Sequence, residues 1–577
     1  MTFKTYIKAL WLLLAVGAFS ACSDNDMATK NEDKKPAQEV KGVQFVIESP
    51  KASAKVGYVA DEDGALLGAR TRTTISHTFG GGADVLWTNT DKIWVKDKNG
   101  TWQQSIATIV TSGGKHATFT LPGNMSDYND NCSVSLVSSD IKSSVLSTYT
   151  SNTGLYTSAA SGTNPTPATG IANIQNQTDV NKFDKAGQWG DCAVGKAKHN
   201  GTKFSLSLEH KAAYLCVLPR CENPALGRNI KLTHIKIESD NVIASDLIEL
   251  QEDGTLNLPT AAAASSLNHK TITASVNNFP LNTDVTNAAT NACYFVVYPG
   301  THNLTIRYTI KDYDTNVETT LTKKVNNVVC NAGSIADITA NLMPLGFYYI
   351  WDARRDYWDG IESEIPVIDS DGVGTTVSSN YPRAESPDAR WSEQTHLQPQ
   401  TTLFKNLPNL NEMMWYFYHG DPHFSYDQDV VIANRGHLHK TTAHGVWFRK
   451  KSVILAYLKT IGYPSTMTEE DMKQAFWETS SSPHRDYHTL GPVYGYFHWS
   501  TDPGVPTNQD DYFFLPTSGL SDEGSLGSYS YPYHQYGFYW TSTAIESGKA
   551  FMLRFSDGHI DLEQQSRIKA CYAYPFE

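Results

Sequence analysis

The residues most able to bind a metal ion form a histidine-rich segment late in the chain. His437, His439 and His444 lie within the stretch HLHKTTAH. In an extended strand His437 and His439 would share one face, and imidazole nitrogens are common zinc ligands. The stretch contains no carboxylate or thiolate that could complete a ligand set, and histidines are frequent on protein surfaces. We therefore predict no metal site here.

Carboxylates are the next candidates for chemistry. The stretch DPHFSYDQD places Asp421, Asp427 and Asp429 near one another, but it lacks the spacing and the glycine of a calcium loop. A glycosidase needs two carboxyl groups about 5–10 Å apart across a cleft. Four acids lie close together in sequence, which is too common a pattern to indicate such a pair: Asp352, Asp356, Asp359 and Glu362.

No sequence pattern of a nucleophile, zinc protease or phosphate site is present, since GxSxG, HExxH and phosphate-binding loops are all missing. We therefore expect a protein that is not an enzyme, with no catalytic residues and no cofactor. The 577 residues carry a formal net charge of −13, which argues against a nucleic-acid partner. A chain of this length is expected to hold two to four domains.

Eight cysteines are widely spaced and form no CxxC pair, so neither a zinc ribbon nor a dense disulfide framework is indicated. We expect most of them to be buried as small apolar side chains, with one or two disulfides left open as an alternative.

The N-terminus has the features of an exported protein. Lys4 and Lys8 precede the apolar run ALWLLLAVGAF, which is too short to span a bilayer. The stretch FSAC resembles a lipobox, which implies a signal peptide over residues 1–21 and lipidation (palmitate) of Cys22. An ordinary secretory signal is the alternative. The following SDND resembles the acidic signal that sends lipoproteins to the outer face of the outer membrane, and residues 22–42 have the composition of a flexible tether.

From Val43 onward, short runs alternate between apolar and polar residues, as in half-buried strands. VQFVIES, FSLSLEH and NLTIRYTI show this period of two, and turn residues separate such runs. Two β-sandwiches fit this span, at residues 43–195 and 196–343. The segment 147–180 is poor in large apolar residues, and we expect a long loop there.

The composition changes after residue 343, where eight of the thirteen tryptophans and eleven of the eighteen histidines are found. We predict helices over residues 406–421, 446–462 and 466–477. Asn409 and Glu412 would form a capping box for the first, Thr466 with Glu469 would open the third, and Gly462 would end the second. Helices followed by a glycine-rich β region favour an α+β domain over residues 344–577. The predicted fold is therefore mainly β, with two tandem β-sandwiches followed by an α+β domain.

The segment TRTTISHTFGGGADVLWTNTDKIWV (71–95) resembles the opening of the fimbrillin family, the subunits of type V pili. Trp87, Asp91, Ile93 and Val95 occupy the family positions, although Asn89 and Thr90 replace the usual glycine before the aspartate. LEHKAAYLCVL and NVVCNAGSIADITANL match the second sandwich of the family. Any other secreted β-sandwich is the alternative.

The fimbrillin resemblance implies assembly by strand exchange with other pilus subunits. In the family, a trypsin-like protease cuts after an arginine, and removal of the first strand opens a groove for a donor strand. Arg70 and Arg72 are the candidate cut sites, and VQFVIES is the strand expected to leave. The alternative is that both arginines are simply exposed. A folded domain after the second sandwich would stop the chain from donating its own strand, which suggests a fimbrium tip or minor subunit.

The last part of the chain resembles the major paralogous domain of bacterial surface proteins, whose fold is related to C-type lectins and to sulfatase-modifying factors. The matching stretches are FFLPTSGL, GFYWTSTA and KAFMLRFSDGHI, with IKAC as a looser version of the closing strand. Formylglycine-generating relatives use cysteines and copper, but Cys571 is the only cysteine in this region, so that activity is not expected.

A lectin-like fold suggests aromatic side chains as a face for a host or microbial glycan or protein. The candidates are Trp499, Tyr512, Tyr533, Tyr536 and Trp540. For Trp540 and its neighbours we favour a structural role in the core over ligand contact. Three functions remain: a pilus-tip adhesin, a stand-alone outer-membrane surface lipoprotein that binds glycans, and a glycan-active surface enzyme.

Overall fold

The computed structural model describes residues 41–48, 56–59, 65–67, 74–77, 83–137, 149–150, 155–156, 166–258, 268–281, 286–366, 377–384, 388–392, 395–490, 496–527, 536–546 and 548–576. It divides into Met1–Lys41 and Gly42–Glu577, and nearly all described residues belong to the second unit. The expected signal peptide, the lipidated Cys22 and almost all of the tether lie outside the described residues.

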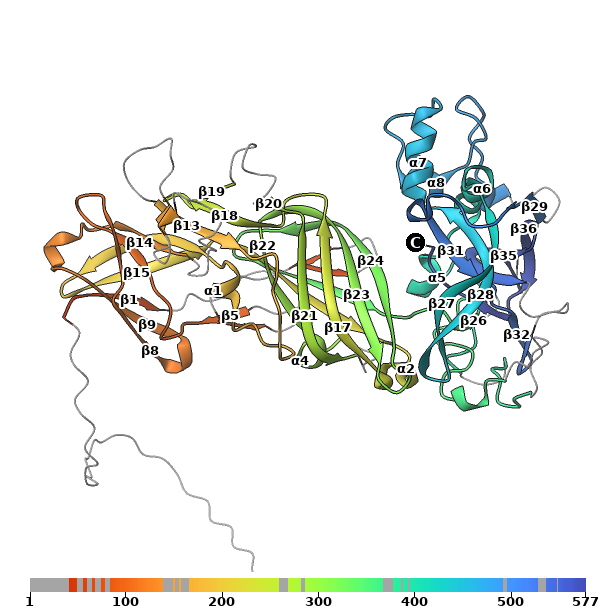
Figure 1. Cartoon of the computed structure of the whole chain (residues 1–577), viewed down its shortest axis with the longest axis horizontal. Coiled ribbons are helices and arrows are strands. Elements are labelled where there is room, and N and C mark those ends of the chain that lie inside the picture. Colours follow the sequence, from red (N-terminus) through yellow and green to blue (C-terminus); the bar gives the residue numbers. More distant parts are fainter. Residues whose placement is uncertain are drawn as a thin grey trace, which may run out of the picture. The chain divides into compact units, whose positions relative to one another are not determined.

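One eight-stranded sheet forms the first sandwich (Figure 1). Buried side chains from its strands share one core around Phe45, Phe119 and Phe204, so the sheet curves around that core. In spatial order its strands are β7 (Trp102–Gln104), β6 (Trp94–Lys96), β10 (Cys132–Leu136), β14 (Ala193–Asn200), β15 (Lys203–His210), β1 (Val43–Glu48), β9 (His116–Leu121) and β8 (Ala107–Thr111). A two-stranded ribbon is separate from it: β4 (Thr74–His77) and β5 (Ala83–Leu86).

The second sandwich packs a five-stranded and a four-stranded sheet on one large core, and a six-stranded sheet adjoins them. The first has the order β22 (Cys293–Val297), β16 (Ala213–Arg220), β25 (Ile335–Asn341), β2 (Val56–Val59), β3 (Ala65–Leu67). The second has the order β21 (Thr271–Pro280), β17 (Ile230–Ser239), β23 (Gly300–Asp312), β24 (Val317–Cys330). The third contains β11 (Tyr149–Thr150), β12 (Leu155–Tyr156), β13 (Thr166–Ile171), β18 (Ala244–Leu250), β19 (Leu256–Asn257) and β20 (Asn268–His269).

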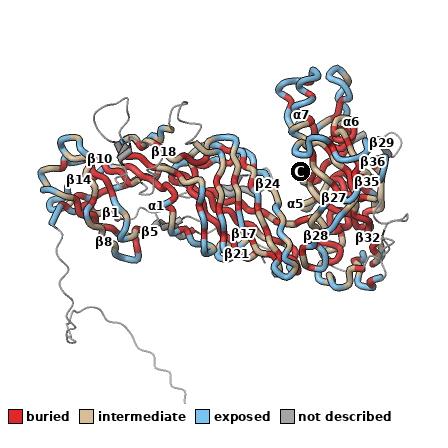
Figure 2. The backbone as a smooth tube through the Cα atoms, viewed as in Figure 1, coloured by how far each residue is buried: buried red, intermediate tan, exposed pale blue. Residues whose placement is uncertain are grey.

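The structure confirms the predicted strands. Their apolar and polar residues alternate, so each strand can bury one face against a core. VQFVIES contains β1, FSLSLEH lies in β15 and NLTIRYTI lies in β23. Along β15 and β23, buried and more exposed positions alternate, as the period of two predicts (Figure 2). The α-helices in the described part of this region are short, with four to six residues each: α1 (Ala186–Trp189), α2 (Pro224–Asn229) and α4 (Ala288–Asn291).

The chain passes between the two sandwiches more often than expected. The expected boundary at residue 195 falls inside β14, and the β14–β15 hairpin pairs with β10 and β1 of the first sheet. The segment before it instead packs with the second core through Ile171, Phe183 and Trp189. Within the expected loop 147–180, β13 pairs with β18. Strand pairing over such sequence distances is not encoded in local composition, which explains both differences.

The C-terminal α+β domain contains two sheets and the longer helices. Its eight-stranded sheet is formed by β29 (Tyr496–Ser500), β36 (His559–Ser566), β35 (Lys549–Ser556), β34 (Gly537–Glu546), β37 (Ala570–Tyr572), β32 (Leu520–Asp522) and β33 (Ser525–Gly527), with β26 (Tyr348–Ile350) on β37. The four-stranded sheet is β30 (Asp502–Pro503), β27 (His423–Asn434), β28 (His437–Arg449), β31 (Tyr512–Pro516). The helices are α5 (Thr402–Lys405), α6 (Leu410–His419), α7 (Lys451–Thr460), α8 (Glu469–Gln474) and α9 (Tyr487–Leu490).

The first predicted helix of this domain is confirmed as α6, with the Asn409–Glu412 capping box in place. The second was predicted too early, because residues up to Arg449 pair in β28 before α7 begins. The third, α8, starts later than predicted, and its capping box is formed by Thr468 and Asp471. Propensity alone does not separate the end of a strand from the start of a helix at such a junction.

All seven cysteines within the described residues are buried and unpaired, as the wide spacing predicts. None of the helices in the described ranges has the length and apolar character needed to cross a bilayer.

Candidate strand-exchange site

Strand β1 occupies an interior position in the first sheet. It pairs in parallel with β15, with Phe45 opposite Phe204, and antiparallel with β9, from Val43–Leu121 to Glu48–His116. Both edges of β1 therefore satisfy backbone groups of its neighbours. Removal of β1 would leave β9 and β15 with a row of unpaired N–H and C=O groups.

The side chains of β1 contribute directly to the first core. Val43, Phe45 and Ile47 are buried, whereas Gln44 is exposed. The Phe45 ring stacks on Phe204 at 4.6 Å between centroids and meets the edge of Tyr128 at 5.4 Å. The groove left by β1 would thus contain apolar pockets at alternate positions, which suit another strand with the same period.

A second part of the N-terminal segment lies in the second sandwich. Strand β2 pairs in parallel with β25, from Val56–Ala336 to Val59–Thr339, and β3 pairs with β2. On its other side β25 pairs with β16. The residues before the candidate cut therefore supply strands to both sandwiches. The sequence had predicted that the cut would displace only the strand VQFVIES. The short apolar runs VGYV and ALL are the sequence signal that we missed.

The candidate cut sites lie outside the described residues. In sequence, Arg70 and Arg72 fall between β3 and β4, so a cut at either would separate all three strands from the rest of the chain. The residues of the fimbrillin resemblance downstream of the cut belong to the first core: Trp87, Ile93 and Val95 are buried. Asp91 accepts a hydrogen bond from the Thr88 N–H at 2.8 Å, which holds the turn before that strand.

The opposite end of the second sandwich continues directly into the C-terminal domain. Strand β25 ends at Asn341 and β26 begins at Tyr348. Within the described residues, this domain closes on itself, because β26 pairs antiparallel with β37 and both lie in one sheet. The following Phe576 is also buried in the core of the domain.

The histidine-rich segment does not form one cluster. His437 Nδ1 lies 3.0 Å from Asp312 Oδ2 in the second sandwich, and the same oxygen accepts a hydrogen bond from the Leu438 N–H. His444 Nδ1 instead accepts the N–H of Asp427 at 3.2 Å, and His439 is exposed. These contacts give His437 and His444 separate structural roles.

Two of the acidic residues considered for catalysis accept hydrogen bonds from nearby backbone N–H groups. Asp352 accepts hydrogen bonds from the backbone N–H groups of Gln400 and Thr401. Asp356 accepts those of Tyr348 and Trp358, and burial raises the pKa of Asp356 to about 8. These contacts explain both carboxyl groups as supports of neighbouring backbone, and they give no support for a glycosidase.

The acids of DPHFSYDQD also have separate partners. Asp421 accepts hydrogen bonds from the Arg449 guanidinium at 2.6 Å and from the Tyr512 hydroxyl at 2.5 Å. Asp429 pairs with Lys440 at 2.9 Å. These separate contacts give no support for a calcium cage shared by Asp421 and Asp429.

Two of the five aromatic candidates are buried, which agrees with the structural role favoured for Trp540 and corrects the candidate Tyr512. Trp540 is buried, and its indole N–H donates to the Tyr349 carbonyl at 2.7 Å. Tyr512 is buried beside Arg449 and donates to Asp421. Both rings therefore serve the interior of the domain and are not available as a ligand face.

The two remaining aromatic candidates within the described residues, Trp499 and Tyr536, have different partners. Trp499 is half-buried and its ring lies 4.5 Å from that of Tyr418. Tyr536 is half-buried under the Arg554 guanidinium at 4.9 Å. Tyr533 lies outside the described residues.

Comparison with known proteins yields weak structural likeness only. No family model and no curated protein matches the chain. A candidate cell adhesion protein from Bacteroides ovatus ATCC 8483 is 11% identical, with 52% of this chain and 92% of that chain covered and a TM-score of 0.28. A fimbrial protein from the same strain is 11% identical, with 92% and 99% covered and a TM-score of 0.20. A candidate adhesin from Bacteroides ovatus is 12% identical, with 40% and 68% covered and a TM-score of 0.19.

Proposed function

We propose that this protein is a fimbrillin-like surface lipoprotein that joins a pilus by accepting a strand from a neighbouring subunit. The observation that supports the proposal is the placement of β1 and β2. Both precede Arg70 in sequence, yet β1 pairs between strands of the first sandwich and β2 pairs with the second. One cut after Arg70 or Arg72 would open a groove between β9 and β15 in the first sandwich and leave β25 as an exposed sheet edge in the second.

The proposal also includes a lipid anchor that the cut removes. Lipid on Cys22 would hold the chain at the outer membrane until the cut releases it, since each buried CH₂ contributes about 0.8 kcal/mol to membrane binding. The cut would remove the lipid together with β1, β2 and β3, so anchoring and polymerisation would exclude each other in one chain.

The C-terminal domain supports a position at the pilus tip or as a minor subunit. Strand β25 cannot serve as a free donor strand for a neighbouring subunit. The chain continues after it into a domain whose first and last described strands pair with each other. The subunit would accept a strand and display its C-terminal domain as an adhesive, lectin-like head. Trp499, Tyr533 and Tyr536 remain the aromatic candidates for its contact with a glycan or protein.

The groove is tested with an arginine-specific protease and a synthetic peptide. The peptide spans residues 43–59, and its matched control carries aspartate at positions 45 and 47. We expect the cut chain, freed of its own segment, to bind the first peptide at least about tenfold more tightly than the control, because aspartate would have to be buried in apolar pockets. The uncut chain should bind neither peptide.

The cut site is tested by the double variant Arg70→Gln, Arg72→Gln. It should resist the protease at this position, remain full length by intact mass and gain no peptide binding. Equal binding of both peptides to the cut chain, or peptide binding by the uncut chain, would contradict the groove. Antibody labelling of residues 344–577 along the whole pilus shaft would contradict the tip position alone.

A further inference from the structure

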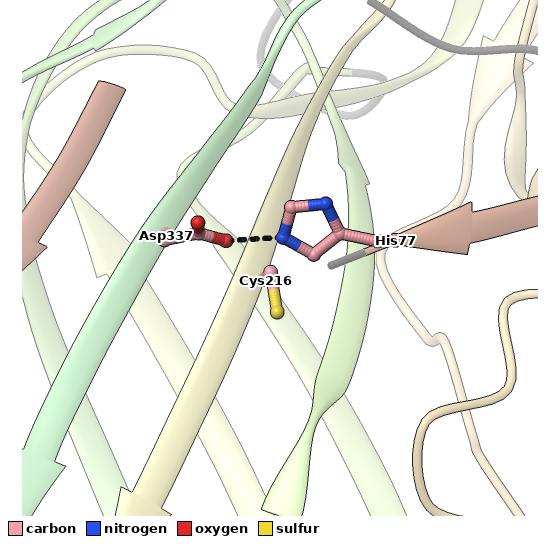
Figure 3. A group of neighbouring side chains, drawn as sticks. All are labelled: His77, Cys216 and Asp337. Atoms are coloured by element: carbon pink, nitrogen blue, oxygen red, sulfur yellow. Dashed lines mark hydrogen bonds and ion pairs between the residues drawn. The ribbon is translucent and has the colours of Figure 1, made fainter. Parts of the chain in front are cut away.

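Three side chains with different metal-binding atoms meet inside the second sandwich. His77 comes from β4, Cys216 from β16 and Asp337 from β25, and all three are buried (Figure 3). His77 Nε2 lies 2.7 Å from Asp337 Oδ1, and one ligand atom from each residue lies within 4.8 Å of the other two. The cluster lies outside the groove of β1 and uses none of the histidines of HLHKTTAH.

The sheet itself fixes two of these side chains. Cys216 and Asp337 are direct partners in the parallel pairing of β16 with β25, so their side chains share one face. The same row continues to Gly57 on β2, which has no side chain to compete for that space. His77 approaches this row from a separate ribbon, as Figure 3 shows. A site built on paired strands has a defined geometry, which metal binding requires.

We propose that His77, Cys216 and Asp337 bind a divalent transition-metal ion, with Zn²⁺ as the best match. Zinc takes imidazole nitrogen, thiolate sulfur and carboxylate oxygen in tetrahedral sites. A thiolate and a carboxylate together cancel the charge of one dication, so the occupied site would be neutral in a dry interior. Calcium and magnesium are disfavoured by the sulfur and nitrogen donors.

The distance between His77 and Asp337 requires only a small adjustment for zinc. Zinc–ligand bonds of about 2.0–2.3 Å place neighbouring tetrahedral ligand atoms roughly 3.3–3.7 Å apart. The His77–Asp337 separation of 2.7 Å would therefore open by less than about 1 Å, and the ion would replace that hydrogen bond. A water molecule would complete the four ligands.

The ion would fasten the ribbon of β4 to the second sandwich. His77 follows the candidate cut sites, whereas Cys216 and Asp337 belong to strands that remain in place. If the proposed function holds, the new N-terminal end would stay attached to β16 and β25 after β2 has left its position beside Asp337. The site itself does not depend on the cut.

The test uses the full, uncut chain, so that its result is independent of strand exchange. The protein is dialysed against metal-free buffer, its zinc is measured by mass spectrometry, and Co²⁺ is then titrated as a coloured substitute. We expect about one tightly held ion per chain and a sulfur-to-cobalt charge-transfer band. Absence of both from the folded wild-type chain would overturn the proposal and leave a plain His77–Asp337 hydrogen bond.

Variants assign the ligands. Cys216→Ser should abolish the charge-transfer band, and His77→Gln should weaken Co²⁺ binding at least about tenfold. Cys330→Ser is the matched control, because Cys330 is also buried in the same core but lies outside the cluster. A band that survives in Cys216→Ser, or disappears in folded Cys330→Ser, would overturn the assignment. Should Cys216→Ser fail to fold, the wild-type titration and His77→Gln decide.

Discussion

In the sandwiches, the segment from Val43 to Leu67 supplies strands to sheets whose other strands come from much later residues, whereas in the C-terminal domain the first and last described strands, β26 and β37, pair with each other. The sandwiches therefore depend on a segment that one peptide-bond cleavage could remove. The C-terminal domain contains no such dependence within its described residues. Strand exchange would therefore act first on the sandwiches, and any effect on the C-terminal domain would pass through Ala433 and Leu438, which pack in the core of the second sandwich.

The largest predicted loss of stability follows from removing a core side chain of β1, and it tests whether the two regions are independent. Phe45→Ala removes a ring stacked on Phe204 and should destabilise the first sandwich by about 3–5 kcal/mol. Hydrogen exchange should increase in β9 and β15 and remain unchanged in β34–β37, because the effect is local. Gln44→Ala, an exposed position on the same strand, is the matched control. Increased exchange in the C-terminal domain would contradict the independence of the two regions.

Sequence patterns predicted the local features of these regions but not the pairing of distant strands. Phe45 and Phe204 were assigned to buried faces from alternation alone, because a half-buried strand repeats every two residues. Their pairing across the chain was not predictable, since register and partner depend on contacts far apart in sequence. The α6 cap was predicted because Asn409 and Glu412 act locally, within one turn.

The candidate sites were harder to predict than the strands. Trp540 and Tyr512 were considered as a ligand face from residue type, but aromatic rings serve equally as core, and burial decides between the two roles. His77 and Asp337 are separated by 260 residues, so no local motif joins them. Only the three-dimensional arrangement of β4, β16 and β25 reveals that cluster.

The second prediction uses pH to separate the regions. Burial raises the pKa of Asp356 to about 8, well above the ordinary value near 4 of an unfolded chain. Between these values the folded state keeps a proton that the unfolded state has lost. The stability of the C-terminal domain should therefore fall as pH rises from about 5 to 8, by up to about 1.4 kcal/mol per pH unit.

Denaturant unfolding of the full chain at several pH values, followed by hydrogen exchange in β26 and β37, would measure this effect. Asp356→Asn should remove the slope and also lower the baseline, since one of its two backbone N–H bonds is lost. The exposed Asp510→Asn serves as the control. An unchanged slope in Asp356→Asn would show that another group sets the pH dependence.

The smallest expected effect concerns the interior role of Trp540. Trp540→Phe keeps an aromatic ring but removes the indole N–H that bonds the Tyr349 carbonyl, next to the strand pair β26–β37. Leaving that buried carbonyl without its partner should cost about 1–3 kcal/mol. The loss should appear as faster hydrogen exchange in β26 and β34, with the sandwiches unchanged. If Trp540→Phe instead kept full stability and lost adhesion or glycan binding, the ring would act on a ligand, and the C-terminal domain would be less self-contained than its strand pairing implies.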